Sequence, residues 1–158
     1  FSLDTDYAVS IAGEEVFRNK KGVHNSYKSP DSVNAIDWTL KDTNREQFDY
    51  YRELIKLRKA HPAFRMTTAD AIARHIKFDK TDRDNLISYS IKDNANGDEW
   101  KEIKLVFNGS GQPEEVKIAK GDWIVIARDG KINADGMGDF KGGKITVEPT
   151  SALILARK

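Results

Sequence analysis

The stretch Ile103–Ala127, IKLVFNGSGQPEEVKIAKGDWIVIA, decides the fold of this chain. Runs rich in β-branched and aromatic residues, at 103–107, 115–118 and 123–127, are separated by the breaks NGSG and KGD. Breaks of this composition are turns, because glycine and asparagine adopt the backbone conformations that tight turns require. Short strands that follow one another with no helix between them favour an antiparallel arrangement.

The same pattern extends from Phe64 to the end of the chain, with further breaks such as Asp129-Gly130, which predicts a two-residue hairpin turn. Regularly spaced short strands of this kind predict an antiparallel β-sandwich over residues 64–158. The predicted strands are Ala71–Asp79, Leu86–Lys92, Ile103–Phe107, Glu115–Ile118, Trp123–Ala127, Lys131–Asn133, Lys144–Val147 and Ala152–Ala156.

One helical segment precedes this region, so the fold class is mostly β with a single helix, predicted over 43–60. Thr43 and Glu46 have the spacing of a capping box. Apolar residues then recur at helical spacing, and His61-Pro62 ends the segment, because the residue before proline is disfavoured in the helical region. The period changes from 3.6 to 2 at Phe64, so we expect two units, residues 1–63 and 64–158. The apolar face consists of Phe48, Tyr51, Leu54 and Ile55.

A polar run upstream of this helix, residues 13–38, reads GEEVFRNKKGVHNSYKSPDSVNAIDW. It is too long for an ordinary connection, and loops of this length are usually functional or disordered. Its regularly placed apolar residues argue against disorder, and we expect Ile36 and Trp38 to be core residues that hold the loop against the helix. Tyr7–Ala12 before it is predicted to be a short strand.

The motifs of this run resemble a known family. Gly13-Glu14-Glu15, Asn25-Ser26-Tyr27, Ser29-Pro30-Asp31 and Ile36-Asp37-Trp38, with single positions between them, are similar to the segment after the last barrel strand of type I pullulanases. These enzymes are α-1,6-glucan debranching glycoside hydrolases of the α-amylase superfamily. The intervening positions are Arg18, Lys20, Gly22 and Asn34.

The resemblance implies that residues 1–63 are the last strand, loop and helix of a (β/α)8 barrel, and that residues 64–158 are the C-terminal β-sandwich of the α-amylase type. In such barrels the loops after the strands build the active-site face. The resemblance therefore assigns possible glucan contacts to Glu15, Arg18, Asn25 and Tyr27. The alternative is that Glu15 and Arg18 pair with each other or with the loop backbone.

No catalytic residue is expected in this chain. Glycoside hydrolysis needs two carboxyl groups on either side of the scissile bond, and neighbours such as Glu14 and Glu15 rarely point into one cleft. The family's catalytic carboxylates lie on earlier strands, in motifs that this sequence does not contain. The chain is therefore expected to supply structure and part of a substrate cleft.

No metal site or cofactor is expected either. His24, His61 and His75 lack paired ligand spacing. Residues 79–84 lack the glycine and glutamate of a calcium loop, and residues 136–138 lack the lysine of a phosphate loop. Trp100 and Trp123 could form an exposed sugar platform, although Trp123 begins an apolar strand and is expected to be buried.

Composition narrows the partners. With 26 basic and 25 acidic residues interspersed, no basic stripe for nucleic acid is visible, and no run is long enough to cross a membrane. The sequence has no cysteine and leaves the localisation open, since the resemblance is compatible with a secreted, cell-surface or cytoplasmic bacterial enzyme.

Three hypotheses remain from the sequence. The first is part of a debranching enzyme that acts on pullulan, glycogen or starch; the others are a stand-alone carbohydrate-binding β-sandwich and an interaction module without sugar affinity. In an isolated chain the apolar helix face would need cover. It could fold onto the sandwich or pair with a second copy, and we expect a homo-oligomer.

Overall fold

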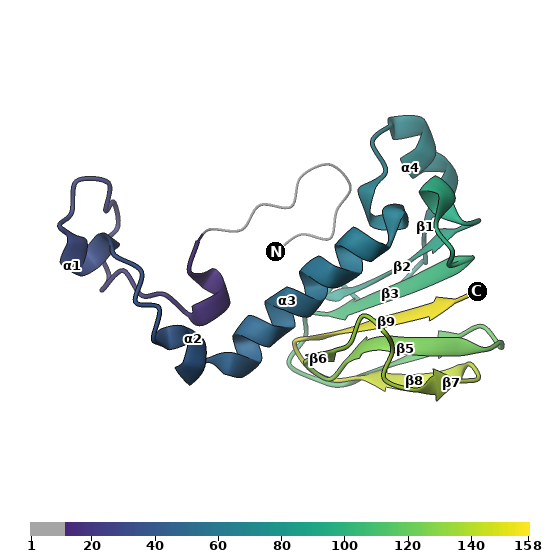
Figure 1. Ribbon diagram of the computed structural model, residues 1–158. Helices are drawn as coiled ribbons and strands as arrows, with labels where there is room; N and C mark the ends of the chain where they lie inside the picture. The colour runs from purple at the N-terminus through teal and green to yellow at the C-terminus, as the bar shows by residue number, and fades with distance from the viewer. Residues whose placement is uncertain (1–11) are drawn as a thin grey trace.

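The computed structural model describes residues 12–158, so the predicted strand Tyr7–Ala12 lies outside the described residues except for Ala12. Apart from the short η3, the helices of the described chain precede its strands (Figure 1). The helices are η1 Glu14–Val16, α1 Asp31–Asn34, α2 Leu40–Thr43, α3 Arg45–Ala60, η2 Pro62–Arg65, α4 Ala69–His75 and η3 Ala95–Gly97. The strands are β1 Ile76–Phe78, β2 Leu86–Lys92, β3 Glu102–Asn108, β4 Glu114–Ile118, β5 Trp123–Arg128, β6 Lys131–Ile132, β7 Asp139–Phe140, β8 Gly143–Val147 and β9 Ser151–Arg157.

All strand pairs in the described chain are antiparallel, as predicted. The larger sheet has the order β1-β2-β3-β9-β5-β6, and β7 pairs with β5. Strands β4 and β8 form a separate two-stranded sheet. The last strand in sequence, β9, is inserted between β3 and β5, so the centre of the sheet is completed by the C-terminal residues.

One face of the larger sheet is covered by helical segments. Leu57 of α3 and Phe64 of η2 are almost completely buried in a core cluster with Leu105 of β3 and Ile154 of β9. Helix α3 crosses the sheet diagonally (Figure 1). The apolar face of α3 was expected to pack either on the sheet or on a second copy of the chain. The structure shows packing on the sheet for the side of α3 that carries the buried residues Leu54 and Leu57.

The other face of the larger sheet is covered in part by the small sheet. Ile118 of β4 and Val147 of β8 share a second core cluster with Trp123, Leu153 and Leu155. Strands β3 and β9 are consequently buried on both faces. This explains why their sequences contain continuous apolar runs rather than a strict alternation with polar residues.

The region 71–79 differs from the prediction, because most of it is helix α4 and only Ile76–Phe78 is a strand. Thr68 caps this helix, since its Oγ1 accepts a hydrogen bond of 3.2 Å from the N–H of Ala71. A threonine in this position satisfies a helix N–H that would otherwise lack a partner. The alternation of apolar and polar residues within 71–79 therefore predicted a strand where most of the segment is helix.

The long helix also begins later than predicted, at Arg45, and the capping box is wrong. Thr43 instead ends the separate helix α2, and Asn44 occupies the N-cap position without a capping hydrogen bond from its side chain. The Asn44 amide donates to the carbonyl oxygen of Val16 at 2.9 Å. Short helices such as α1, α2 and α4 also accompany α3, where a single helical segment was expected.

The remaining strands agree with the prediction to within one or two residues, apart from the short β7, which was missed. The turn at Asp129-Gly130 is confirmed, because both residues have positive φ angles, 52° and 73°. These angles match the primed turns that connect twisted antiparallel strands, and Arg128 and Lys131 on either side are paired.

The end of α3 is joined to the sheet by Asp98, a buried residue in the connection between β2 and β3. Its carboxylate accepts hydrogen bonds from the N–H groups of Ala63 (3.1 Å) and Trp100 (2.9 Å), and lies 3.0 Å from His61 Nδ1. The His61 ring stacks on Trp100 with 3.3 Å between ring centroids. Burial alone would raise the pKa of the Asp98 carboxyl, but the hydrogen bonds from His61, Trp100 and Ala63 outweigh it and lower this pKa.

We expect Asp98→Ala to lower the free energy of unfolding at pH 7 by about 3–5 kcal/mol, because two N–H groups and His61 lose a buried partner. The lowered pKa means that the unfolded chain takes up the proton first as the pH falls. The contribution of Asp98 is therefore complete above its unfolded pKa of about 3.9 and is lost as the pH falls through the folded pKa.

Urea denaturation at a series of pH values measures both effects. The variant should be less stable at pH 7 and should lose less further stability in acid than the unmodified chain. Asp84→Ala, in an exposed turn, is the matched control and should change stability by less than about 0.5 kcal/mol. Equal acid sensitivity of the unmodified chain and Asp98→Ala would contradict the assignment.

Candidate functional site

The candidate site is the polar loop of residues 13–38, which extends from the N-terminal end of α3 away from the sheet (Figure 1). It is attached to the helices through η1, whose Val16 is completely buried. The hydrogen bond from Asn44 to Val16 fixes η1 beside the start of α3. The loop therefore has one fixed base and an outer part that contains α1.

Glu15 and Arg18 lie together at this base, around Gly13. The Glu15 carboxylate accepts a hydrogen bond of 2.9 Å from the N–H of Gly13, and Arg18 donates to the carbonyl oxygens of Ala12 (3.2 Å) and Asn34. Gly13 has a φ of 101°, and a β-carbon placed there would lie 2.6 Å from the Arg18 side chain. Only glycine allows this close approach, so the turn positions both side chains.

Asn34 organises the outer part of the loop. Its Nδ2 donates to the carbonyl oxygens of Ser26 (2.7 Å) and Ser29 (2.8 Å), and its Oδ1 accepts from Lys20 Nζ at 2.7 Å. Lys20 also donates to Ser26 Oγ at 3.0 Å. Sequence reasoning placed Asn34 in the family motif but not among the site residues. Its fixed place in that motif, between Ser29-Pro30-Asp31 and Ile36-Asp37-Trp38, was the sequence signal that could have pointed to this role.

Asn25 and Tyr27 lie on the outer part and are exposed, with 75% of Tyr27 accessible to solvent. Asn25 Oδ1 is 3.5 Å from the N–H of Tyr27, and Lys28 Nζ lies 5.4 Å from the Tyr27 ring centroid. The predicted residues thus form two groups, Glu15 with Arg18 at the base and Asn25 with Tyr27 outside. Asn34 links the groups, because it contacts Arg18 through its carbonyl oxygen and Ser26 through its amide.

A groove of about 290 Å³ runs along α3 beside the base of the loop. Glu15 and Arg52 are its charged lining residues, and the exposed side chain of Ile55 forms part of its wall. Burial raises the pKa of the Tyr51 phenol, and the nearby carboxylates of Glu14 and Glu15 raise it further. Glu15 thus borders both the loop and an apolar surface, which is lined by Phe48, Tyr51 and Ile55.

Two tryptophans differ from the predictions. Trp38 was expected in the core, but 62% of it is exposed. Trp100 cannot serve as an exposed sugar platform, because it is only 5% exposed and stacks on His61. Trp123 is buried as expected, and its Nε1 donates to the carbonyl oxygen of Ala119 at 2.9 Å.

A hydrolytic site needs two carboxyl groups facing a common bond, and the Glu15 carboxylate is bound to the backbone of its own turn. Within residues 12–158 no group of three or more metal-ligating side chains occurs. No helix in the same range is long and apolar enough to cross a membrane.

Comparison with known proteins gives the family of the resemblance. Residues 72–131 match the family described as "Pullulanase, all-beta domain". The pullulanase of Bacillus subtilis (strain 168) is 45% identical over 107 residues, which are 68% of this chain and 15% of that protein. The resemblance to pullulanases is confirmed.

Solved pullulanase structures extend the similarity to almost the whole chain. Pullulanase from Bacillus acidopullulyticus has a TM-score of 0.85 and 37% identity over 92% of this chain. The type I pullulanase of Bacillus subtilis str. 168, complexed with maltose, has a TM-score of 0.81 and 36% identity, also over 92%. The chain spans only 18% and 20% of these two proteins, so it is similar to a small part of a pullulanase.

We expect Asn34→Ala to loosen the outer loop without affecting the sheet. The variant loses three hydrogen bonds of the Asn34 side chain, each worth about 1 kcal/mol, so local opening becomes more frequent. Trypsin should cleave after Lys20, Lys21 or Lys28 roughly a hundredfold faster, while the urea midpoint of the whole chain stays the same. Asn25→Ala, at an exposed position in the same loop, is the control; equal cleavage of both variants would contradict the role of Asn34.

Proposed function

We propose that this chain is part of an α-glucan debranching enzyme that hydrolyses α-1,6-glucosidic linkages in pullulan, glycogen or starch branch points. The observation that carries the proposal is the similarity to solved pullulanases over 92% of the chain. Residues 64–158 make up only about three-fifths of the sequence, so the similarity extends into the loop and α3. This extension favours an enzyme segment over a stand-alone sugar-binding sheet.

Within that enzyme, residues 1–63 contribute the last strand, loop and helix of a (β/α)8 barrel, and residues 64–158 form the C-terminal β-sandwich. The chain supplies structure and one wall of a substrate cleft, and other segments of the parent supply the catalytic carboxylates. Two observations support this division: the motifs of the loop resemble the segment after the last barrel strand of type I pullulanases, and the Glu15 carboxylate is bound to its own turn.

We assign glucan contact to Glu15, Arg18, Asn25 and Tyr27. Tyr27 presents an exposed ring, and Asn25 presents an amide two residues away on the same exposed segment. An aromatic face beside an amide suits a sugar, which offers an apolar ring face and hydroxyl groups. Glu15 and Arg18 act at the base, where each retains polar atoms beyond the backbone bonds described above. Pullulanases complexed with maltose and maltotriose are among the similar structures, in agreement with a glucan as the ligand of the parent.

A chimaeric enzyme tests this function. The corresponding segment of the Bacillus subtilis pullulanase is replaced by this chain, and the release of reducing ends from pullulan is measured. We expect the chimaera to hydrolyse pullulan and the isolated chain to release nothing. In the chimaera, Tyr27→Ala should raise KM about three- to tenfold, because one stacking contact is lost.

Thr67→Ala in the chimaera, at an exposed position outside the loop, is the control and should leave KM unchanged. A correctly folded chimaera without activity would overturn the proposed function. Hydrolysis by the isolated chain that disappears with Glu15→Gln would show that the chain has its own catalytic carboxylate.

The proposal also concerns the groove on α3. In the parent enzyme other segments cover this groove, and in the isolated chain a second copy of the chain covers it. Ile55 is 45% exposed and forms the apolar part of the groove together with Phe48 and Tyr51. Complete burial of such a side chain contributes about 1.5–3 kcal/mol. A pair of copies related by a two-fold axis would bring two identical grooves together.

Sedimentation equilibrium should therefore show a concentration-dependent increase in the mass of the isolated chain. Ile55→Glu should abolish this increase, because it places a charge in the contact. Ile87→Glu replaces an isoleucine that is 53% exposed on β2 and should leave the association unchanged. A monomer at all concentrations, or equal effects of the two substitutions, would contradict the role of the groove.

A further inference from the structure

A cleft of about 460 Å³ lies on the sheet face that carries the second core cluster, beyond the area that β4 and β8 cover. We call it the β2–β4 cleft. Pockets that bind small molecules usually have about 300–1,000 Å³, so its size suits a ligand of a few rings. Its floor consists of Ser88, Ser90 and Lys92 from β2 and Glu102 and Lys104 from β3.

These floor residues share one face because of the strand register. Ser90 is paired with Lys104 and Lys92 with Glu102, and alternate residues of a strand point to the same side. On the same face, Leu153 and Leu155 of β9 are buried in the apolar core. One sheet face thus has an apolar half that is covered and a polar half that opens into the cleft.

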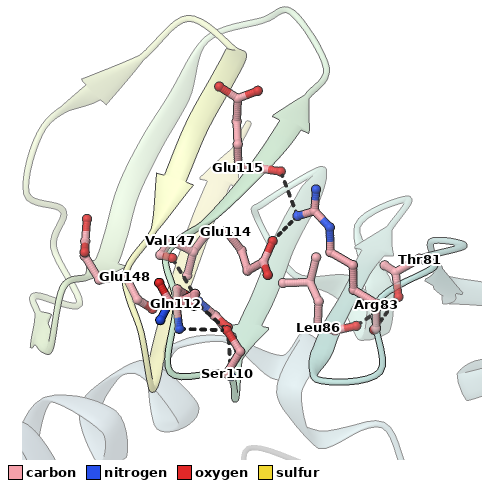
Figure 2. A network of polar contacts seen from close by, with 10 residues as sticks. Thr81, Arg83, Leu86, Ser110, Gln112, Glu114, Glu115, Val147 and Glu148 are labelled. Atoms are coloured by element: carbon pink, nitrogen blue, oxygen red, sulfur yellow. Dashed lines mark hydrogen bonds and ion pairs between the residues drawn. The ribbon is translucent and has the colours of Figure 1, made fainter.

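The cleft has fixed walls. The turn at residues 79–83 forms one wall and β4 forms the opposite wall. Figure 2 shows Arg83 reaching from the turn to β4, where its guanidinium donates to the Glu114 carboxylate and to the carbonyl oxygen of Glu115. Thr81 Oγ1 also donates to the carbonyl oxygen of Leu86 at 3.0 Å, which ties the turn to β2. The cleft is therefore preformed, which lowers the entropic cost of binding.

The charges of the floor are already paired within the protein. Lys104 forms an ion pair with Asp79, whose carboxylate also accepts from Ser88 Oγ at 2.6 Å. Glu102 pairs with Arg157 and lies 3.7 Å from Lys92 Nζ. The cleft lining contains five cationic and four acidic side chains, a net charge of only +1. This balance favours a neutral ligand over a phosphate or another multiply charged ion.

The Ser90 hydroxyl is an open hydrogen-bonding group on the floor of the cleft. Ser90 is only 4% exposed and lines the cleft, and its hydroxyl makes no hydrogen bond within residues 12–158. Its oxygen is not among the fully buried side-chain atoms that lack a partner in this range, so it faces the cleft. A ligand hydroxyl in the cleft can therefore hydrogen-bond to Ser90 beside the ammonium of Lys92 and the carboxylate of Glu102.

We propose that the β2–β4 cleft binds a neutral polyhydroxylated ligand, a short α-glucan. Sugar hydroxyls both donate and accept, so one ligand can satisfy Ser90 and also contact the paired charges of Lys92 and Glu102 without disturbing their balance. The choice of an α-glucan rests on the proposed function. The polar cleft itself, its charge balance and the unpaired hydroxyl do not. The site is separate from the loop of residues 13–38.

The test is a titration of the ¹⁵N-labelled 158-residue chain with maltotriose, followed through backbone amide shifts. We expect saturable shifts at Ser88, Ser90 and Lys104. Ser90→Ala removes only a hydroxyl without an internal partner, so the fold should be unaffected, and Kd should rise about three- to tenfold, the loss of one neutral hydrogen bond. Ser90→Ile places a larger side chain in the cleft and should abolish these shifts.

Thr67→Ala, at an exposed threonine outside both the cleft and the loop of residues 13–38, is the control and should leave Kd unchanged. A parallel titration with inorganic phosphate should give no shifts at the floor. The proposal is overturned if maltotriose shifts only loop residues, if Ser90→Ala binds as tightly as the unmodified chain, or if phosphate binds and maltotriose does not.

The outcome is separable from that of the proposed function. If the chimaera hydrolyses pullulan but maltotriose does not shift the amide signals of the cleft floor, the proposed function stands and the proposed ligand site in the cleft is wrong. If maltotriose binds at the cleft floor but the chimaera is inactive, the ligand site in the cleft stands and the proposed function is wrong.

Discussion

The carboxylate of Asp98 is the interaction on which the arrangement of this chain depends. It binds the backbone after α3, the N–H of Trp100 before β3, and the ring of His61. These contacts fix where the helix ends relative to the sheet. With that end fixed, Leu57 and Phe64 reach the core, and the direction of α3 is set. A buried carboxylate that is this well hydrogen-bonded gives the junction a single geometry, because any other arrangement leaves it unpaired.

The position of the loop of residues 13–38 depends on the Asp98 junction, because α3 connects the two. Its base is attached where Val16 is buried and Asn44 binds the Val16 carbonyl oxygen, at the opposite end of the helix from Asp98. Beyond this point the loop is held by its own polar contacts, chiefly those of Asn34, and not by apolar packing. Such a loop can keep a defined shape while its exposed side chains remain available to a ligand.

The sequence predicted those features that depend on neighbouring residues. Strand β2 was predicted with its exact bounds, Leu86–Lys92, because it alternates clearly, and the Asp129-Gly130 turn follows from residues that tolerate positive φ. Helix α4 was missed because its N-cap, Thr68, lies before the segment that was read as a strand. The burial of Trp100 could not be predicted, since it depends on His61, 39 positions away, and on the ring contact between them.

The candidate site was likewise predicted only in part. The sequence motifs located the loop, but the roles of its residues depend on the backbone path, which sequence alone does not give. Gly13 with a φ of 101° brings Arg18 beside Glu15, and Asn34 connects segments that are separated in sequence. The polar cleft was invisible for a different reason. The serines of β2 alternate with apolar residues as on the solvent side of an ordinary strand. Only the register shows that they share one sheet face with the buried leucines of β9, with β3 between them.

That juxtaposition is what separates the β2–β4 cleft from ordinary surface. A sheet face that packs against a second sheet normally continues as apolar side chains, because each polar group placed there must find a partner. Here β4 and β8 cover only the apolar half, and Arg83 joins the turn of residues 79–83 to β4. Lys104 and Glu102 are then buried with their charges paired, while the hydroxyl of Ser90 makes no hydrogen bond within residues 12–158 and faces the cleft. Sequences depart from the simplest pattern for a fold mainly where function requires it, and the open polar half of this face is such a departure.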